Sequence, residues 1–431
     1  MLRLDCRQDG FEQAFRALLA MKREVSEDVD ATVRGILADV RTRGDAALAD
    51  YTLRFDKVDL GAVGLVIGAD ERQAARSACA PAALSALELA AVRIRDFHER
   101  QKPEDMLFTD HLGVRLGWRW TAVESAGLYV PGGLATYPSS VLMNAIPARV
   151  AGVERLAMVV PTPGGVINPL VLAAADIAGI DVVYRIGGAQ AIAALAYGTE
   201  AIAPVVKIVG PGNAYVAAAK RQVFGTVGID MIAGPSEVVV LADDTGHPDW
   251  IAADLLAQAE HDTAAQSILI TSDAALAAAT VAAVEHQLKT LPRADTARAS
   301  WRDFGAIILV PDAEHALPLI DRLAPEHLEL HLADPDALVP RIRNAGAIFV
   351  GAHTPEAIGD YVGGSNHVLP TARSARYASG LGVADFVKRT SILSCNAEGL
   401  RVLGPAAIAL GEAEGLQAHA RSVAIRMNSE K

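Results

Sequence analysis

LAMVV at residues 156–160, VVYRI at 182–186 and VVKIV at 205–209 are apolar runs with the length of buried strands. Each is followed by a segment with helical spacing, over residues 169–178, 189–197 and 214–223. Strands that alternate with helices at this spacing predict a parallel sheet covered by helices. The sequence from residue 155 onward is therefore expected to form an α/β fold.

The same alternation continues toward the C-terminus. Four more strands are expected, at residues 238–242, 267–270, 306–310 and 347–350, with helices over 248–259 and 273–288. Two helix starts are well marked, because Asn168 precedes Pro169 as a cap and His247-Pro248-Asp249 places proline and an acid in a first turn. The continued alternation therefore predicts further parallel sheet covered by helices.

The flanking segments have a different character. Residues 26–51 and 69–101 have helical spacing and many charges, and the segment after Gly382 is rich in Ala and Leu. We expect a mostly helical N-terminal region and a helical C-terminal tail. Pro131-Gly-Gly and Gly234-Pro-Ser bracket a segment that resembles a complete smaller lobe.

Composition narrows the class of protein. The 431 residues are 51% hydrophobic and carry a formal charge of −12, which argues against a nucleic-acid partner. The N-terminus is charged where a signal peptide would be apolar, and prolines and aspartates interrupt the most apolar region, 156–183, so no membrane span is expected. Cys6, Cys79 and Cys395 lack CxxC spacing and are expected to be free thiols of a cytoplasmic protein.

Four side chains could supply a metal site. Gln258 and His261 lie three positions apart in a predicted helix and share a face. With Asp360 and His419 they offer two imidazoles, a carboxylate and an amide oxygen, and zinc accepts such ligands from separate segments. On the residues alone the plainer alternative is favoured, in which His261 and Asp360 decorate or cap helices, because Gln-x-x-His is a weaker signature than His-Glu-x-x-His.

The segment Pro325-Glu326-His327 is suited to proton transfer. Proline disfavours the α region for Ala324, so a turn would present the two side chains. Histidine titrates near neutrality and can take a proton from an alcohol as hydride leaves, while a neighbouring carboxylate can orient it or activate water. The alternative is a surface turn, since Glu329 and His331 nearby show that such residues are not rare here.

The usual dinucleotide fingerprint GxGxxG is missing. Two glycine turns are partial substitutes, Gly187-Gly188-Ala-Gln190 and Gly210-Pro-Gly-Asn213, and each places backbone N–H groups before a helix. They could bind phosphate or serve as plain strand-helix connections. Glu414, five residues before His419, could bind a cationic amine or lie on a solvated helix face, as Glu412 could.

Taken together, the motifs resemble the histidinol dehydrogenase family. The resemblance runs from about Val40 to Arg426 and includes Tyr129-Val-Pro-Gly-Gly133, Ala233-Gly-Pro-Ser-Glu237 and Asn366-His367-Val-Leu-Pro370. It implies the following roles: zinc ligands Gln258, His261, Asp360 and His419; an acid/base pair, Glu326 and His327; NAD contacts Tyr129, Gln190 and Asn213; and substrate contacts Ser236, Gln258, His261, His327, Asp360, Glu414 and His419. His367 is not a ligand position in the family and is interpreted as structural.

The resemblance also implies an architecture of two parallel-sheet, incomplete Rossmann-like lobes, one inserted in the other. The implied division is an N-terminal arm (1–21), a main α/β domain with the metal and catalytic residues (22–129 and 237–381), an inserted lobe that contributes to NAD binding (130–236), and a helical tail that reaches the partner subunit of a homodimer (382–431).

The implied activity is oxidation of L-histidinol through L-histidinal to L-histidine, with one zinc per subunit and two NAD+. One rival is a paralogue that oxidises another small alcohol, such as a sulfonated diol. A rival of another class is a two-lobed binding protein without catalysis, in which Glu326 and His327 would have no role.

Overall fold

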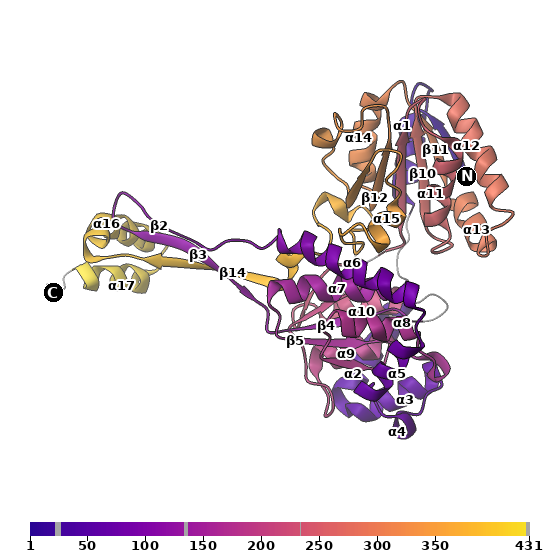
Figure 1. The fold of residues 1–431 in the computed structure, drawn as a ribbon. Coiled ribbons are helices and arrows are strands. Elements are labelled where there is room, and N and C mark those ends of the chain that lie inside the picture. Colours follow the sequence, from indigo (N-terminus) through magenta and orange to yellow (C-terminus); the bar gives the residue numbers. More distant parts are fainter. Residues whose placement is uncertain (22–26, 133–136, 233, 428–431) are drawn as a thin grey trace.

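The computed structural model describes residues 1–21, 27–132, 137–232 and 234–427. It contains two lobes, each built on a parallel sheet, and an extended arm that leaves them (Figure 1). Gly133 and Ala233, which belong to two of the motifs above, lie outside the described residues. The expected fold class of two parallel-sheet lobes is confirmed.

The first lobe surrounds a six-stranded parallel sheet with the order β1-β11-β10-β9-β12-β13. Its strands are rich in Val, Ile and Leu and are covered on both faces, as a parallel sheet requires. The strands are β1 (Leu2–Asp5), β9 (Glu237–Ala242), β10 (Gln266–Thr271), β11 (Ala306–Leu309), β12 (His327–His331) and β13 (Ala347–Val350). The helices are α1 (Phe11–Ala20), α11 (Pro248–Ala259), α12 (Ala274–Gln287), α13 (Ala294–Phe304), α14 (Ala313–Leu323) and α15 (Glu356–Tyr361).

The second lobe surrounds a five-stranded parallel sheet with the order β6-β5-β4-β7-β8. The strands are β4 (Ser125–Tyr129), β5 (Arg155–Val159), β6 (Val182–Tyr184), β7 (Lys207–Val209) and β8 (Gly228–Ile229). The crossover helices are α7 (Pro138–Ala151), α8 (Pro169–Ile177), α9 (Gly188–Tyr197) and α10 (Ala214–Val223), and the outer helices are α2 (Glu27–Arg43), α3 (Asp45–Asp56), α4 (Leu60–Val63), α5 (Ala69–Ala78) and α6 (Pro81–Glu99).

The arm is a three-stranded antiparallel sheet of β2 (Met106–Thr109), β3 (Arg115–Ala122) and β14 (Val387–Ser394). Helices α16 (Ala397–Ala413) and α17 (Gln417–Met427) pack on each other at its far end, away from both lobes (Figure 1). Helices α16 and α17 agree with the expected helical tail, and residues 387–394 add a strand that the sequence analysis did not predict. The side chains of β14 are exposed almost throughout, so the strand carries no buried apolar face that would reveal it.

Strand pairing groups two segments differently from the expected boundaries. Residues 2–5 do not stand apart as an arm, since β1 pairs with β11 at the edge of the six-stranded sheet. Helices α2 to α6 and strand β4 join the second lobe, and Val33, Leu48 and Ile94 lie in its cores. The apolar face of a helix shows that it packs on something, but not on which sheet. The second lobe is thus inserted between α1 and β9 of the first.

Shorter 3-10 turns complete the described backbone: η1 (Pro163–Gly165), η2 (Val339–Arg341), η3 (Ser374–Arg376) and η4 (Val383–Phe386). Among the described residues, no single helix has both the length and the apolar character needed to cross a membrane. Within the same residues, one pair of helices, α5 and α6, meets those two criteria jointly, and the pair is bent by 113°.

Candidate active site

A cavity of about 500 Å³ is lined by residues of both lobes. The second lobe contributes Pro131 and the Pro211–Ala214 turn, which follow the carboxyl ends of β4 and β7. These two strands are adjacent in the sheet. Strands β5 and β6 extend the sheet on the side of β4, and β8 extends it on the side of β7. Ligands of open α/β sheets bind at such a switch point between two directions of strand order. The first lobe contributes Ser236, Glu326 and His327, at the amino ends of β9 and β12.

Seven of the residues predicted to form the site line this one cavity. They are Asn213, Ser236, Gln258, His261, Glu326, His327 and Asp360. Tyr129 and Gln190 lie buried inside the second lobe instead, and Glu414 and His419 are exposed on the arm. The structure therefore brings together residues from five separate segments, while the other four lie outside the cavity.

The backbone of Glu237 holds both members of the Glu326-His327 pair. Its N–H donates to Glu326 Oε2 over 3.0 Å, and its carbonyl accepts the Nδ1–H of His327 over 3.0 Å. His327 Nε2 then lacks a hydrogen-bond partner among the described residues and lies 3.9 Å from Asp360 Oδ1. Burial lowers the pKa of His327, which favours a neutral imidazole whose Nε2 lone pair faces the site.

The local chain path explains how the pair is presented. Ala324 has left-handed backbone angles, with φ 43° and ψ 60°, and ends α14. Pro325 and Glu326 follow, and His327 is the first residue of β12. Both Glu326 and His327 are buried, so the alternative of a solvated surface turn is wrong.

A set of nitrogen and oxygen donors lies beside His327. Gln258 is buried, and its Oε1 has no hydrogen-bond partner among the described residues. One ligand atom from each of His261, Glu356 and Asp360 lies within 4.8 Å of the others. An unpartnered buried amide oxygen beside an imidazole and carboxylates fits a zinc ion, which binds such donors.

Glu356 is a residue that sequence reasoning missed. It is buried at the start of α15, and its unpartnered Oε2 lies 3.7 Å from His327 Nδ1. Burial, followed by the charge of Asp360, raises the pKa of Glu356 well above its ordinary range. One signal could have revealed it, since Glu356 precedes Asp360 by one helical turn and so shares its face.

His367 connects the two lobes at the edge of the cavity. Its Nδ1–H donates to the backbone carbonyl of Asp360 over 3.0 Å. Its Nε2 therefore accepts, and takes the hydroxyl hydrogen of Ser140 over 3.0 Å. Ser140 belongs to α7 of the second lobe, so His367 fixes α15 relative to that helix.

The turn that carries Asn213 is rigidly held. Asp230 accepts the Gly210 N–H over 2.8 Å, and Lys220 donates to the Gly210 carbonyl over 2.9 Å. Lys220 and Asp230 also form a buried ion pair. Gly210 has φ 112°, and an added Cβ would lie 2.2 Å from the carbonyl oxygen of Tyr129, so only glycine fits there. Asn213 caps α10 by accepting the N–H groups of residues 215 and 216.

Tyr129 and Gln190 lie behind this turn. The Tyr129 hydroxyl accepts the backbone N–H of Gly188 over 3.1 Å, and burial raises its pKa to about 12. Gln190 is buried in the first turn of α9. Their place in the second lobe is next to the Gly187-Gly188 turn, outside the lining of the cavity.

Glu414 and His419 lie where α16 meets α17. Glu414 is the C-cap of α16, and His419 is in the first turn of α17. Both helices are at the far end of the arm (Figure 1). The described chain does not bring either side chain to its own cavity.

A buried imidazole, acidic side chains and zinc-type donors lie together between two parallel-sheet lobes. They define an α/β protein with a candidate proton-transfer site beside a candidate metal centre. The family model of histidinol dehydrogenase matches residues 19–427. The chain is 69% identical to the histidinol dehydrogenase of Rhizobium meliloti (strain 1021), over 99% of this chain and 98% of the relative. It is 67% identical to that of Bradyrhizobium diazoefficiens, over 99% of each.

A crystal structure of histidinol dehydrogenase from Elizabethkingia anophelis has the same fold. The TM-score is 0.94 at 36% identity, with coverage of 99% of this chain and 98% of the other. The chain therefore belongs to the histidinol dehydrogenase family, a family of oxidoreductases. The resemblance of its sequence motifs to this family is confirmed.

Proposed function

We propose that this chain oxidises L-histidinol through L-histidinal to L-histidine with two NAD+ and one zinc per subunit, as the last step of histidine biosynthesis. The observation that carries the proposal is the unpartnered Nε2 of His327, which faces a cavity lined by Gln258 and Asp360. The names of the relatives, at 67–69% identity over nearly the whole chain, support the same substrate.

His327 is the base of both oxidation steps. Its Nδ1–H is held by the Glu237 carbonyl, so the Nε2 lone pair takes the proton from the alcohol oxygen as hydride leaves the carbon that bears this oxygen. NAD supplies the hydride acceptor when bound. Asp360 Oδ1 lies 3.9 Å from Nε2, and Glu356 Oε2 lies 3.7 Å from Nδ1. The charge of Asp360 favours the imidazolium that forms, whereas the raised pKa of Glu356 favours the neutral form of that side chain.

Glu326 assists the step between the two oxidations. One of its oxygens is fixed by the Glu237 N–H, which orients the carboxylate next to His327. We propose that its carboxylate accepts a proton from the water that adds to the aldehyde carbon of histidinal. The resulting hydrate has an alcohol proton again, which His327 removes while the second hydride leaves.

Four side chains would hold the zinc: Gln258, His261 and Asp360 of one subunit and His419 of its partner. Zinc supplies a Lewis-acidic anchor for the imidazole and amine of the substrate, so that the reacting carbon is fixed by proximity. The orphaned Oε1 of Gln258 supports this site. Ser236 lines the same cavity, and Glu414, on the partner's arm with His419, would bind the substrate amine or imidazole.

The proposed homodimer is supported by the arm. Its end exposes large apolar side chains, including Leu393, Val402, Leu410 and Ile425. An apolar surface of this kind marks a site of protein association. A second copy of the chain would cover it and would bring the shared His419 and Glu414 to the cavity.

We place NAD at the carboxyl ends of β4 and β7. Residues 211–214, at the amino end of α10, line the cavity there, and the positive end of that helix suits a pyrophosphate. Asn213 is the proposed contact with the best support. Tyr129 and Gln190 are proposed from the family resemblance, and their position beside the Gly188 turn is compatible with a nearby nucleotide.

We also propose a cytoplasmic location. Cys6, Cys79 and Cys395 are free thiols in the structure, which is typical of a reducing compartment.

The function is tested by following NADH formation with histidinol, histidinal and a panel of other small alcohols, including a sulfonated diol, in the presence of zinc. We expect turnover with histidinol and histidinal and the release of histidine. Turnover of another alcohol with no activity on histidinol would replace this proposal with the paralogue alternative. Binding of ligand without NADH formation would favour a binding protein.

A further inference from the structure

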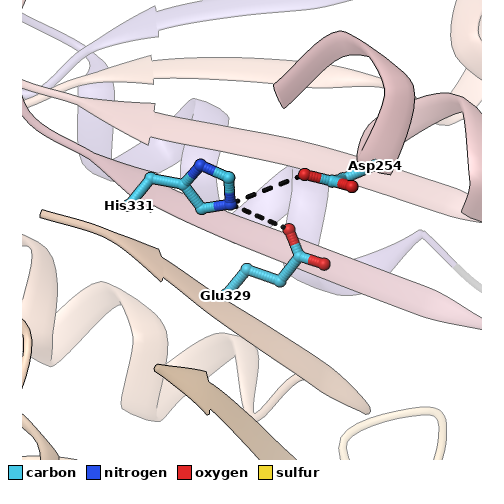
Figure 2. Close-up of side chains that lie close together, drawn as sticks. All are labelled: Asp254, Glu329 and His331. Carbon is cyan, nitrogen blue, oxygen red and sulfur yellow. Dashed lines mark hydrogen bonds and ion pairs between the residues drawn. The ribbon is translucent and has the colours of Figure 1, made fainter. Parts of the chain in front are cut away.

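A second group of buried titratable side chains lies on the same strand as His327. Glu329 and His331 follow it at alternate positions of β12 and so point to the same face. His331 Nε2 lies 3.3 Å from Glu329 Oε2 and 3.5 Å from Asp254 Oδ2. Figure 2 marks these two contacts with dashed lines. These three residues line none of the described cavities, so the mechanism above does not use them.

Two members of this cluster, Asp254 and Glu329, are each one structural repeat from a residue of the active site. Asp254 lies on α11 one helical turn before Gln258, and Glu329 follows His327 on β12. Glu329 Oε1 also accepts the backbone N–H of Glu356 over 2.7 Å. Glu356 begins α15, one turn before Asp360. The cluster therefore joins the three elements that carry the proposed zinc ligands and the base.

The members of the cluster are linked by hydrogen bonds and by a shared proton. Glu329 is fully buried and accepts hydrogen bonds from the Glu356 N–H and from His331. Burial, followed by the charge of Glu329, raises the pKa of Asp254 to about 8. Asp254 is thus mostly protonated at neutral pH and can share its proton with Glu329. The bonds from Glu329 to His331 and to the backbone of Glu356 restrict the arrangement of the elements that they join.

We propose that Asp254, Glu329 and His331 are positioning residues for the active site: they fix α11, β12 and α15 relative to one another and thereby set the places of Gln258, His261 and Asp360. This inference rests on the proposed zinc site. The supporting geometry is the set of contacts from β12 to both helices. Side chains that orient metal ligands without touching the metal typically change its affinity about 10- to 100-fold when removed.

The experiment compares Glu329→Ala and Asp254→Ala with the wild-type holoenzyme. The control is Ser300→Ala, which removes a buried hydrogen bond of the same lobe, from Ser300 Oγ to the Ala265 carbonyl, between two residues that belong to neither β12 nor α15. Three quantities are measured: metal content per chain, the rate of zinc loss to a chelator, and the absorption spectrum of the cobalt-substituted protein. Melting temperatures of the metal-free proteins report general loss of stability.

We expect zinc loss to be about 10- to 100-fold faster in Glu329→Ala and faster to a smaller degree in Asp254→Ala, with an altered cobalt spectrum in both. Ser300→Ala should keep the wild-type rate and spectrum. Wild-type zinc retention and spectrum in Glu329→Ala would overturn the inference. If that variant does not fold, Asp254→Ala decides by the same criterion. A wild-type protein without bound zinc would refute the proposed function instead, and a second metal that is lost with Glu329 would make the cluster a metal site of its own and overturn the positioning role.

Discussion

His327 donates its Nδ1–H to the backbone carbonyl of Glu237 over 3.0 Å. A carbonyl oxygen can only accept, so this bond fixes the tautomer in which Nε2 carries the lone pair. The same residue also holds Glu326 through its N–H. The two side chains thus share one anchor, on the strand next to their own.

Replacement of the base should affect both oxidations. His327→Asn should slow the oxidation of histidinol and of histidinal by about 10²- to 10⁴-fold, because hydride loss from alcohol or hydrate needs a base. His315→Asn, at an exposed position of α14, is the control and should keep full activity. The rates are measured separately with each substrate. If the variant oxidised either substrate at the wild-type rate, His327 would not be the base of that step.

Glu326 should be more important for the oxidation of histidinal than for the oxidation of histidinol. Glu326→Gln retains a side-chain oxygen that can accept the Glu237 N–H, but it removes the charge that takes a proton from water. Oxidation of histidinal should therefore fall more than the first hydride transfer, as measured by single-turnover NADH formation. Equal losses in both would make Glu326 an orienting group for His327.

The zinc assignment predicts a dependence on His261. Chelation should abolish activity, added zinc should restore it, and His261→Asn should lower the zinc content because one imidazole ligand is lost. His247→Asn, at the exposed opposite end of α11, is the matched control. Elemental analysis of dialysed protein gives the content. Full zinc occupancy in His261→Asn would contradict the assignment.

The raised pKa of Asp254 predicts that the free energy of unfolding depends on pH. From about pH 4, the unfolded chain releases this proton, while the folded protein keeps it up to about pH 8. Unfolding then releases a proton, so the free energy of unfolding falls as the pH rises through this window and levels off above it. Asp254→Asn cannot titrate, and the melting temperature of the wild type should therefore fall relative to that of the variant between about pH 5 and pH 8.

The control for this comparison is Asp249→Asn, at an exposed position of the same helix. Its melting curve should run parallel to that of the wild type across the pH range. Metal-free protein is used throughout, so that zinc binding does not add its own pH dependence. If the curve of Asp254→Asn were also parallel, Asp254 would not hold a proton in the folded state.

Shared active sites predict complementation between inactive chains. His327→Asn and His419→Asn are each expected to be inactive, but subunit exchange should produce heterodimers with one intact site and partly restored activity. The exposed position of His419 at the end of the arm is the reason for this expectation. A mixture that stays inactive, with heterodimers shown by two affinity tags, would place the whole site within one chain.

Elements with a clear apolar pattern could be predicted from the sequence. The observed ranges of α10, α11 and β13 are the predicted ones, and the other strands predicted from apolar runs are found within two residues. Strand β12 was missed, although all five of its residues are buried. Its sequence, HLELH, alternates apolar with titratable side chains, and the latter belong to the site and to the Asp254 cluster. A strand that carries chemistry on one face does not have the composition of a core strand.

The site could be predicted only in part, for a related reason. Gln258, His261 and Asp360 were found through the resemblance of their motifs to those of a known family. Glu356 and Asp254 belong to no such motif, and their roles depend on which helices flank β12. That neighbourhood follows from the strand order, with β9 and β13 on either side of β12, and no local pattern encodes it.

At the cavity, the carboxyl ends of the strands of the second lobe face the amino ends of the strands of the first lobe. As a result, α10 points its amino end into the cavity and α11 points its carboxyl end into it. The first end carries a partial positive charge and the second a partial negative charge. The folded backbone thus gives the cavity an electrical polarity, apart from any charge on its side chains. Its wall in the second lobe favours an anion and its wall in the first lobe favours a cation.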